Sequence, residues 1–193
     1  MPGTYRVQLF KRVKGERTAL TQPVAFEVQL LPNATLTVAE RQQAFAFQRE
    51  AQQLQRVVLG ANATMAEVST RLDALKRAVE QITKPTTLDA EVRAAIVKLR
   101  GIREQLNGDN TPGRYSEPTE TSLLGRMNTA AGFGGTLAAP TGTQRRQLEI
   151  VRERFPAIHA ALTGFVAGEL ATLERKAEAE GAAWTPGRIV PLP

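Results

Sequence analysis

The stretch from Thr64 to Lys84, TMAEVSTRLDALKRAVEQITK, carries the clearest structural signal in the chain. Its apolar residues recur at steps of four, three, four and three, the spacing of one stripe along an α-helix that packs against other helices. That stripe consists of Val68, Leu72, Leu75, Val79 and Ile82. Thr64 and Glu67 have the spacing of a capping box, which predicts the start of the helix, and Lys84-Pro85 predicts its end. A helix with one such stripe needs helical partners, so the stretch indicates a helical bundle.

Neighbouring segments supply such partners. Residues 38–59 carry a similar stripe behind a second capping box, formed by Thr37 and Glu40. The sequence Gly60-Ala61-Asn62 predicts a short turn, so we expect the helices before and after it to pack antiparallel. A third helix is predicted over residues 88–106 and should end at Asn107-Gly108.

Two more helices are predicted over residues 120–138 and 141–180. The last one opens with Thr141 and Gln144 at capping-box spacing, and Pro156 should kink it. The loop 108–119 is long for a bundle connection, which favours a crossover along the bundle or a place where function resides. The glycines of residues 131–135 weaken the fourth helix, but they lack the preceding strand and the Gly-Lys-Ser/Thr ending of a phosphate-binding loop.

The N-terminal residues have a different spacing of apolar side chains. Residues 4–14 and 22–31 alternate apolar and polar side chains, which is typical of strands. The polar, glycine-containing residues 11–17 between them predict a turn region, so the two strands should form a β-hairpin. Because an isolated two-stranded hairpin is marginal in water, we expect these strands to lie on the bundle or to belong to a larger sheet.

Composition excludes several classes of site. The chain has 193 residues and no cysteine, so disulfides, iron–sulfur clusters and thiolate metal sites are excluded. No stretch is long and apolar enough to predict a membrane span, and the N-terminus does not have the pattern of a signal peptide. The formal net charge of +6 invites an interpretation as a nucleic-acid or anionic-surface binder, but the arginines are interleaved with glutamates along the helices.

No residue pattern predicts an active site or a cofactor site. His159 is the only histidine and has no signalled catalytic partner, and Asp109 and Glu117 lack the spacing of a calcium loop. The candidate interaction residues are the densest basic cluster and the single tryptophan. They are Lys11, Arg12, Lys14, Arg17 and Trp184. Trp184 either anchors a partner or, together with Ile189, pins the C-terminal tail onto the protein.

The segments PGTYRVQL at residues 2–9 and QPVAFEV at 22–28 are followed in the chain by the Gln-rich residues 37–45 and by LLGRMN at 123–128. This order of parts resembles the C-terminal region of bacterial β-propeller proteins with BNR or sortilin-like repeats, often described as glycosyl-hydrolase-like. The first two segments resemble the last two strands of the β-sandwich in those proteins, and the other two resemble the helical bundle that follows. Members of that family are several times longer, so the resemblance implies the tail of a larger, exported protein whose ligand site lies in the propeller.

We therefore expect a mostly α fold, an antiparallel bundle of four to five helices with a short N-terminal β-hairpin. The expected parts are the hairpin at residues 1–33, the bundle at 34–183 and an extended tail at 184–193. The expected function is that of a non-catalytic accessory or protein-interaction module that contacts the parent propeller domain or self-associates through the hairpin edge. The alternative is a basic helical module that binds nucleic acid or an anionic surface, with affinity falling steeply as salt rises.

Overall fold

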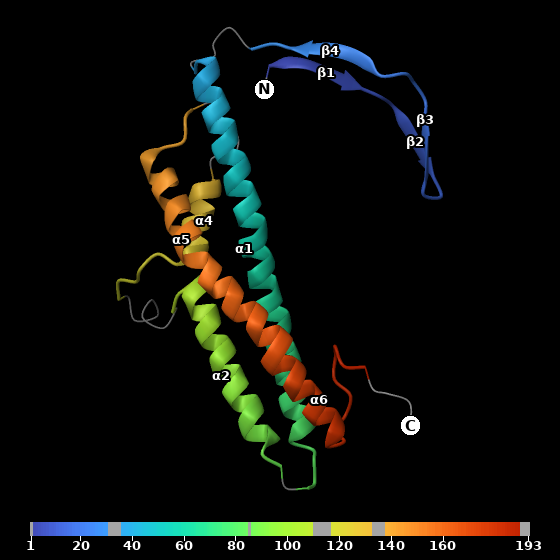
Figure 1. Cartoon of the computed structure of the whole chain (residues 1–193), viewed down its shortest axis with the longest axis vertical. Coiled ribbons are helices and arrows are strands. Elements are labelled where there is room, and N and C mark those ends of the chain that lie inside the picture. Colours follow the sequence, from blue (N-terminus) through green and yellow to red (C-terminus); the bar gives the residue numbers. More distant parts are fainter. Residues whose placement is uncertain (1, 31–35, 85, 110–116, 133–137, 190–193) are drawn as a thin grey trace. The chain divides into compact units, whose positions relative to one another are not determined.

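A computed structural model of the chain describes residues 2–30, 36–84, 86–109, 117–132 and 138–189 (Figure 1). The strands are β1 (Gly3–Val7), β2 (Phe10–Val13), β3 (Glu16–Ala19) and β4 (Val24–Val28). The helices are α1 (Val38–Val79), α2 (Leu88–Asn107), α4 (Leu123–Ala131) and a continuous helix made of α5 (Gly142–Gly164), the π-helical turn η1 (Phe165–Leu170) and α6 (Ala171–Ala179). The prediction of a mostly α fold with an N-terminal hairpin is confirmed. The glycine-rich residues 133–135 and the loop interior 110–116 lie outside the described residues.

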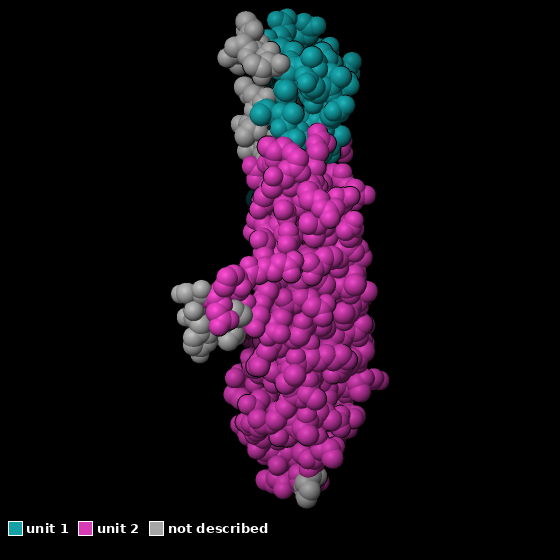
Figure 2. All heavy atoms as spheres, turned by 90° about the vertical axis from the view of Figure 1, so that its left-hand side faces the viewer, with its two compact units in different colours: residues 1–47, 135–140 teal, residues 48–134, 141–193 magenta. Residues whose placement is uncertain are grey.

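Contacts divide the chain into two compact units, which Figure 2 shows in two colours. One comprises residues 1–47 and 135–140, and the other comprises residues 48–134 and 141–193. The first unit therefore contains the hairpin and the first turns of α1. The second contains the rest of α1 and the other helices, with most of the buried apolar side chains.

The predicted turn at Gly60-Ala61-Asn62 is wrong, because α1 runs through these residues without a break. It is 42 residues long, which corresponds to about 63 Å at 1.5 Å per residue. Thr64 is not a helix start either. Its hydroxyl donates to the carbonyl of Gly60 at 3.0 Å, as a threonine does inside a helix. The predicted antiparallel pair at 38–59 and 64–84 is thus a single helix, which ends at Val79 rather than Lys84.

The apolar stripe explains why the helix continues. Its buried residues keep alternating steps of three and four through the glycine, since Val58, Ala61, Met65 and Val68 follow one another at that spacing. Ala61 is only 6% exposed and therefore takes a core position in place of a turn position. Gly60 lies on the exposed side, where a helix tolerates glycine at a cost of about 1 kcal/mol.

Ion pairs and hydrogen bonds give the relative directions of the long helices in the bundle. Between α1 and α2, Asn62 is hydrogen-bonded to Asn107 at 2.9 Å and Glu80, just beyond α1, pairs with Arg93 at 3.0 Å, so these two helices are antiparallel. Lys176 pairs with Glu91 and Lys98 pairs with Glu169, so the last helix is also antiparallel to α2.

The first and last helices of this bundle run parallel. Glu50 of α1 pairs with Arg152 of α5 at 2.9 Å, and Arg71 of α1 pairs with Glu174 of α6 at 2.6 Å. Both sequence numbers rise together along the two helices. The long helices therefore alternate in direction along the chain, and α4 packs on α5 beside the end of α2 (Figure 1).

The last helix begins and continues as an amphipathic element. Thr141 and Gln144 form the predicted capping box, with both reciprocal hydrogen bonds present. Pro156 lies inside α5. The departure from α geometry occurs farther on, at η1, where the buried stripe steps by five residues from Phe165 to Leu170.

The two described ends of the loop after α2 lie close together, which differs from the crossover along the bundle that the sequence favours. A Cβ placed on Gly108 would lie 3.4 Å from the Cβ of Ser122, so the loop leaves α2 and returns to α4 at nearly the same point. The Ser122 hydroxyl caps α4 by accepting from the Gly125 N–H at 3.0 Å, so this helix begins at Leu123 rather than at residue 120.

Gly60→Ala tests the continuity of α1. Apart from the adjacent residues and the backbone of α1 itself, no atom of the described residues lies within 4 Å of the added methyl group. Since the backbone is helical, we expect the free energy of unfolding to rise by about 0.5–1 kcal/mol in urea denaturation. Gly101→Ala in α2 has an equally open site and should give the same gain. A loss of stability in Gly60→Ala alone would mean that the chain turns at Gly60.

Glu91→Gln tests the contact between α2 and α6. The hydrogen bond from Lys176 lowers the pKa of the Glu91 carboxyl, so its contribution to stability is present above the unfolded pKa and is lost as the pH falls through the folded pKa. The wild type should therefore be more stable than Glu91→Gln at neutral pH, and the difference should vanish in acid. In a protein that already carries Lys176→Gln, adding Glu91→Gln should leave the stability unchanged. A gap that widens in acid would contradict this assignment.

Candidate interaction surface

The half of the hairpin farther from its tip, formed by β1 and β4, presents an apolar face. Strands β1 and β4 pair antiparallel with Tyr5 opposite Phe26 and Val7 opposite Val24, and the two rings stack with centroids 6.0 Å apart. Alternation along each strand places the apolar side chains on one side and Thr4, Arg6, Ala25 and Glu27 on the other. We call the first side the apolar face; it consists of Tyr5, Val7, Val24, Phe26 and Val28. Its side chains are between 38% and 59% exposed.

The two pairs of strands form one ribbon (Figure 1). Between them the ladder is interrupted, and three hydrogen bonds span the gap. The Leu20 N–H donates to the Leu9 carbonyl at 2.8 Å, the Gln8 amide donates to the Thr21 carbonyl at 2.9 Å, and the Leu9 N–H donates to the Thr21 hydroxyl at 3.2 Å. These bonds continue the pairing from one ladder to the other.

The tip of the hairpin differs from the predicted turn region at 11–17. Most of these residues belong to β2 and β3, and the turn itself consists of Lys14 and Gly15, with φ values of 49° and 89°. Two consecutive positive φ angles are typical of the type I′ turn, whose twist matches that of the strands it joins. The short turn fixes the register of β2 against β3, and that register decides which basic residues share a face.

The structure brings together two of the four predicted basic residues. Arg12 and Arg17 are directly opposite each other, whereas Lys11 pairs with Thr18 on the other side of the ribbon and Lys14 is in the turn. The guanidinium carbon of Arg17 lies 3.7 Å from the centroid of the Phe10 ring. We call Phe10, Arg12 and Arg17 the arginine face. All three side chains are exposed.

Trp184, the fifth predicted residue, lies far along the chain, in the C-terminal segment. It is 63% exposed, and its indole N–H donates to the Arg188 carbonyl at 3.0 Å. The expectation that Ile189 pins this segment is wrong, because Ile189 is 95% exposed. The buried residues are Thr185 and Arg188, at 4% and 7% exposure.

Sequence reasoning missed Arg188. Its guanidinium donates to the Ala183 carbonyl at 2.7 Å, to the Ala182 carbonyl at 3.2 Å and to the carboxylate of Glu178 on α6. Pro186 and Gly187 place it there through a turn closed by the Arg188 N–H and the Thr185 carbonyl, and the Pro-Gly dipeptide is the signal that predicts such a turn.

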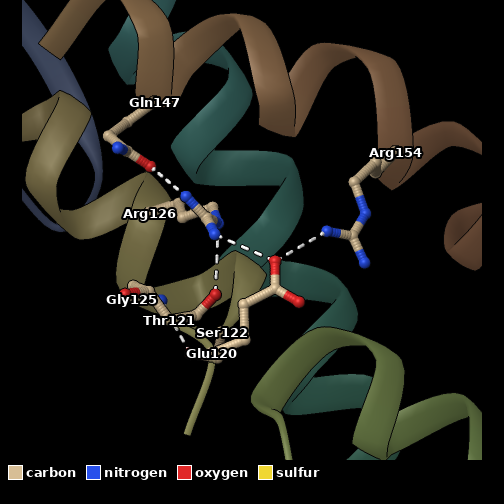
Figure 3. A network of polar contacts seen from close by, with 7 residues as sticks. All are labelled: Glu120, Thr121, Ser122, Gly125, Arg126, Gln147 and Arg154. Carbon is tan, nitrogen blue, oxygen red and sulfur yellow. Dashed lines mark hydrogen bonds and ion pairs between the residues drawn. The ribbon is translucent and has the colours of Figure 1, made fainter. Parts of the chain in front are cut away.

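A polar network anchors the returning end of the loop that precedes α4. Arg126 donates to the Thr121 carbonyl at 3.1 Å, to the Gln147 amide oxygen at 2.8 Å and to Glu120 at 3.0 Å, and Arg154 also reaches Glu120 (Figure 3). A hollow of about 350 Å³ beside it is lined by polar residues that include Glu104, Asp109 and Arg154. Because the charged groups of the network pair with one another, we interpret it as an anchor for the loop.

A second hollow, of about 430 Å³, lies between α1 and the last helix. Its walls are mainly small or apolar, among them Gly60, Ala61, Leu162 and Val166, and His159 also lines it. The His159 ring contacts Phe155 with centroids 5.8 Å apart. Within the part of the chain that the structure describes, no three His, Cys, Asp or Glu side chains form a group that could hold a metal ion. None of the described helices is long and apolar enough to cross a membrane.

Comparison with protein-family models, with curated proteins and with solved structures finds no match to this chain.

Arg188→Met tests what holds the C-terminal segment. The change removes charge-assisted hydrogen bonds to Glu178 and to two carbonyls, which typically contribute about 1.5–3 kcal/mol each. We expect the segment to detach, so that the emission of Trp184, the only tryptophan, shifts to longer wavelength. Arg175→Met is the matched control, because Arg175 is exposed and, among the described residues, its hydrogen bonds are to Ala171 and Thr172 of α6. Equal spectra for the two variants would contradict the assignment.

Proposed function

We propose that this chain is a non-catalytic accessory module that binds a protein through the apolar face of its N-terminal hairpin. The observation that carries the proposal is the exposure of Tyr5, Val7, Val24, Phe26 and Val28 on one side of a two-stranded ribbon. Large apolar side chains gathered on a single face mark interaction sites when no core covers them.

The shape of this surface favours a β-sheet as its counterpart. A two-stranded hairpin is marginally stable alone and gains stability when its apolar face packs on a second sheet or a helix. Each outer edge of β1 and β4 also carries N–H and C=O groups that can pair with an added strand. Thr4, Arg6 and Glu27, on the opposite side, suit contact with water.

The family resemblance offers one source for such a sheet. In the propeller proteins that the sequence resembles, the corresponding strands belong to a β-sandwich of the same polypeptide. We therefore propose that the counterpart is a sheet in a longer form of this protein, which would make the chain an accessory part of an exported propeller protein. A second copy that pairs through the hairpin edge is the other arrangement that this surface suits.

The charge distribution of the helices favours protein binding over the alternative of a basic helical module. Several arginines and lysines on the helices pair with carboxylates of neighbouring helices, as Arg71 does with Glu174 and Lys98 with Glu169. Pairs of this kind reduce the positive potential that a helix surface could offer to phosphates.

A photo-reactive phenylalanine analogue at position 26 tests the proposal in the native host. We expect irradiation to produce one discrete protein adduct, because Phe26 is 47% exposed at the centre of the apolar face. The control position is Val97, which is 63% exposed on α2. Mass spectrometry of the adduct, with the solution mass from light scattering, separates a second copy from a different protein.

Two results would refute the proposed function. One is an adduct at position 26 that is no more abundant than the one at position 97. The other is an adduct with nucleic acid in place of protein, which would support the basic module.

A further inference from the structure

We infer that the arginine face of the hairpin tip binds carboxylates, so that the partner of this module carries an acidic segment that reaches the tip of the ribbon. The inference rests on the proposed function and adds the chemistry of the partner. The residues that carry it are Phe10, Arg12 and Arg17.

The register of β2 and β3 places two like charges in direct opposition. Arg12 and Arg17 are Cα partners, and like charges at directly opposite positions of an antiparallel pair are destabilising. In the described part of the chain no carboxylate forms an ion pair with either arginine. The one carboxylate of these strands, Glu16, is opposite Val13 and so belongs to the other side of the ribbon. An anion that bridges the two guanidinium groups would remove the repulsion.

The Phe10 ring restricts the position of the Arg17 guanidinium. With its carbon 3.7 Å from the ring centroid, the Arg17 guanidinium is held against the aromatic face by a cation–π interaction. A guanidinium carries five N–H groups, so those that do not point at the ring remain able to donate to another group. A planar fork of this kind matches the two oxygens of a carboxylate.

The same geometry disfavours single-stranded nucleic acid. Proteins that bind it combine a cationic groove along several phosphates with aromatic rings on which bases stack. Here Arg17 occupies a face of the Phe10 ring, and Lys11 is on the other side of the ribbon. The arginine face thus offers two adjacent guanidinium groups on a ribbon whose other end carries the apolar face, a combination that suits a protein surface.

The test measures binding of a fluorescent oligo-glutamate peptide to the full chain by anisotropy at low salt. Arg12→Glu should weaken binding of the peptide roughly tenfold or more, because it replaces one of the two guanidinium donors with a carboxylate that repels the negatively charged peptide. The matched control is Arg100→Gln with Arg103→Gln, which lowers the net charge equally at exposed positions of α2. We expect the control to change the affinity less than about twofold.

Hydrogen exchange separates lost binding from a lost hairpin. Arg12→Glu turns the like-charged pair into an oppositely charged pair with Arg17, so the Leu20 N–H, bonded to Leu9 in the middle of the ribbon, should exchange as slowly as in the wild type or more slowly. If the Leu20 N–H exchanges faster in Arg12→Glu than in the wild type, carboxylate binding is tested with a second variant, Arg12→Lys with Arg17→Lys. It keeps both charges but removes the fork, and we expect binding to weaken by roughly threefold to tenfold.

Several outcomes would overturn the inference. They are an equal loss of affinity in Arg12→Glu and in the α2 control, an unchanged affinity in the double lysine variant, and tighter binding of a short mixed-sequence DNA strand than of oligo-glutamate. If position 26 still yields a protein adduct in those cases, only the carboxylate inference fails. If position 26 yields none, the proposed function itself fails, whatever the peptide binds.

Discussion

The fold depends on one unbroken apolar stripe along α1. From Ala51 to Val79 its buried side chains form one wall of the core of the larger unit, and α2 and the last helix contact the same helix through Asn62, Glu50 and Arg71. Burial of side chains such as Met65 and Leu72 contributes about 1.5–3 kcal/mol each, well above the cost of the exposed Gly60 within the same helix. The sum of these contacts, not the local preference of any single residue, keeps the helix continuous.

The sequence predicts the fold best where local and tertiary signals agree. The capping box at Thr141 and Gln144 and the end of α2 at Asn107-Gly108 are confirmed, because hydrogen bonding and the apolar stripe change at the same residues there. Thr64 and Glu67 show the same motif, yet the stripe passes through them without a change of phase, so the motif marks no boundary. The spacing of apolar residues across Ala61 therefore indicates a continuous helix. The predicted turn is wrong because it relies on the turn-forming residue types of Gly60-Ala61-Asn62 instead of that spacing.

The candidate surface was predictable in composition and not in geometry. Lys11, Arg12, Lys14 and Arg17 are recognisable as a basic cluster, but only the two-residue turn at Lys14-Gly15 fixes which of them face one another. The buried Arg188 is harder to predict, because arginine is ordinarily exposed and its binding site includes main-chain carbonyls of the segment that follows α6. Such a site depends on backbone conformation, which residue types alone do not specify.

The π-helical turn has a consequence for how relatives of this chain would be found. Buried residues in α5 are spaced by three and four up to Phe165, then by five to Leu170, and again by three and four through Leu173 and Ala177. The turn thus accommodates one additional residue while α6 keeps its inward face. A homologue without that residue would have an ordinary α-helix and the same packing. An alignment will therefore keep the two halves of the helix in register only if it allows a one-residue gap between Phe165 and Leu170.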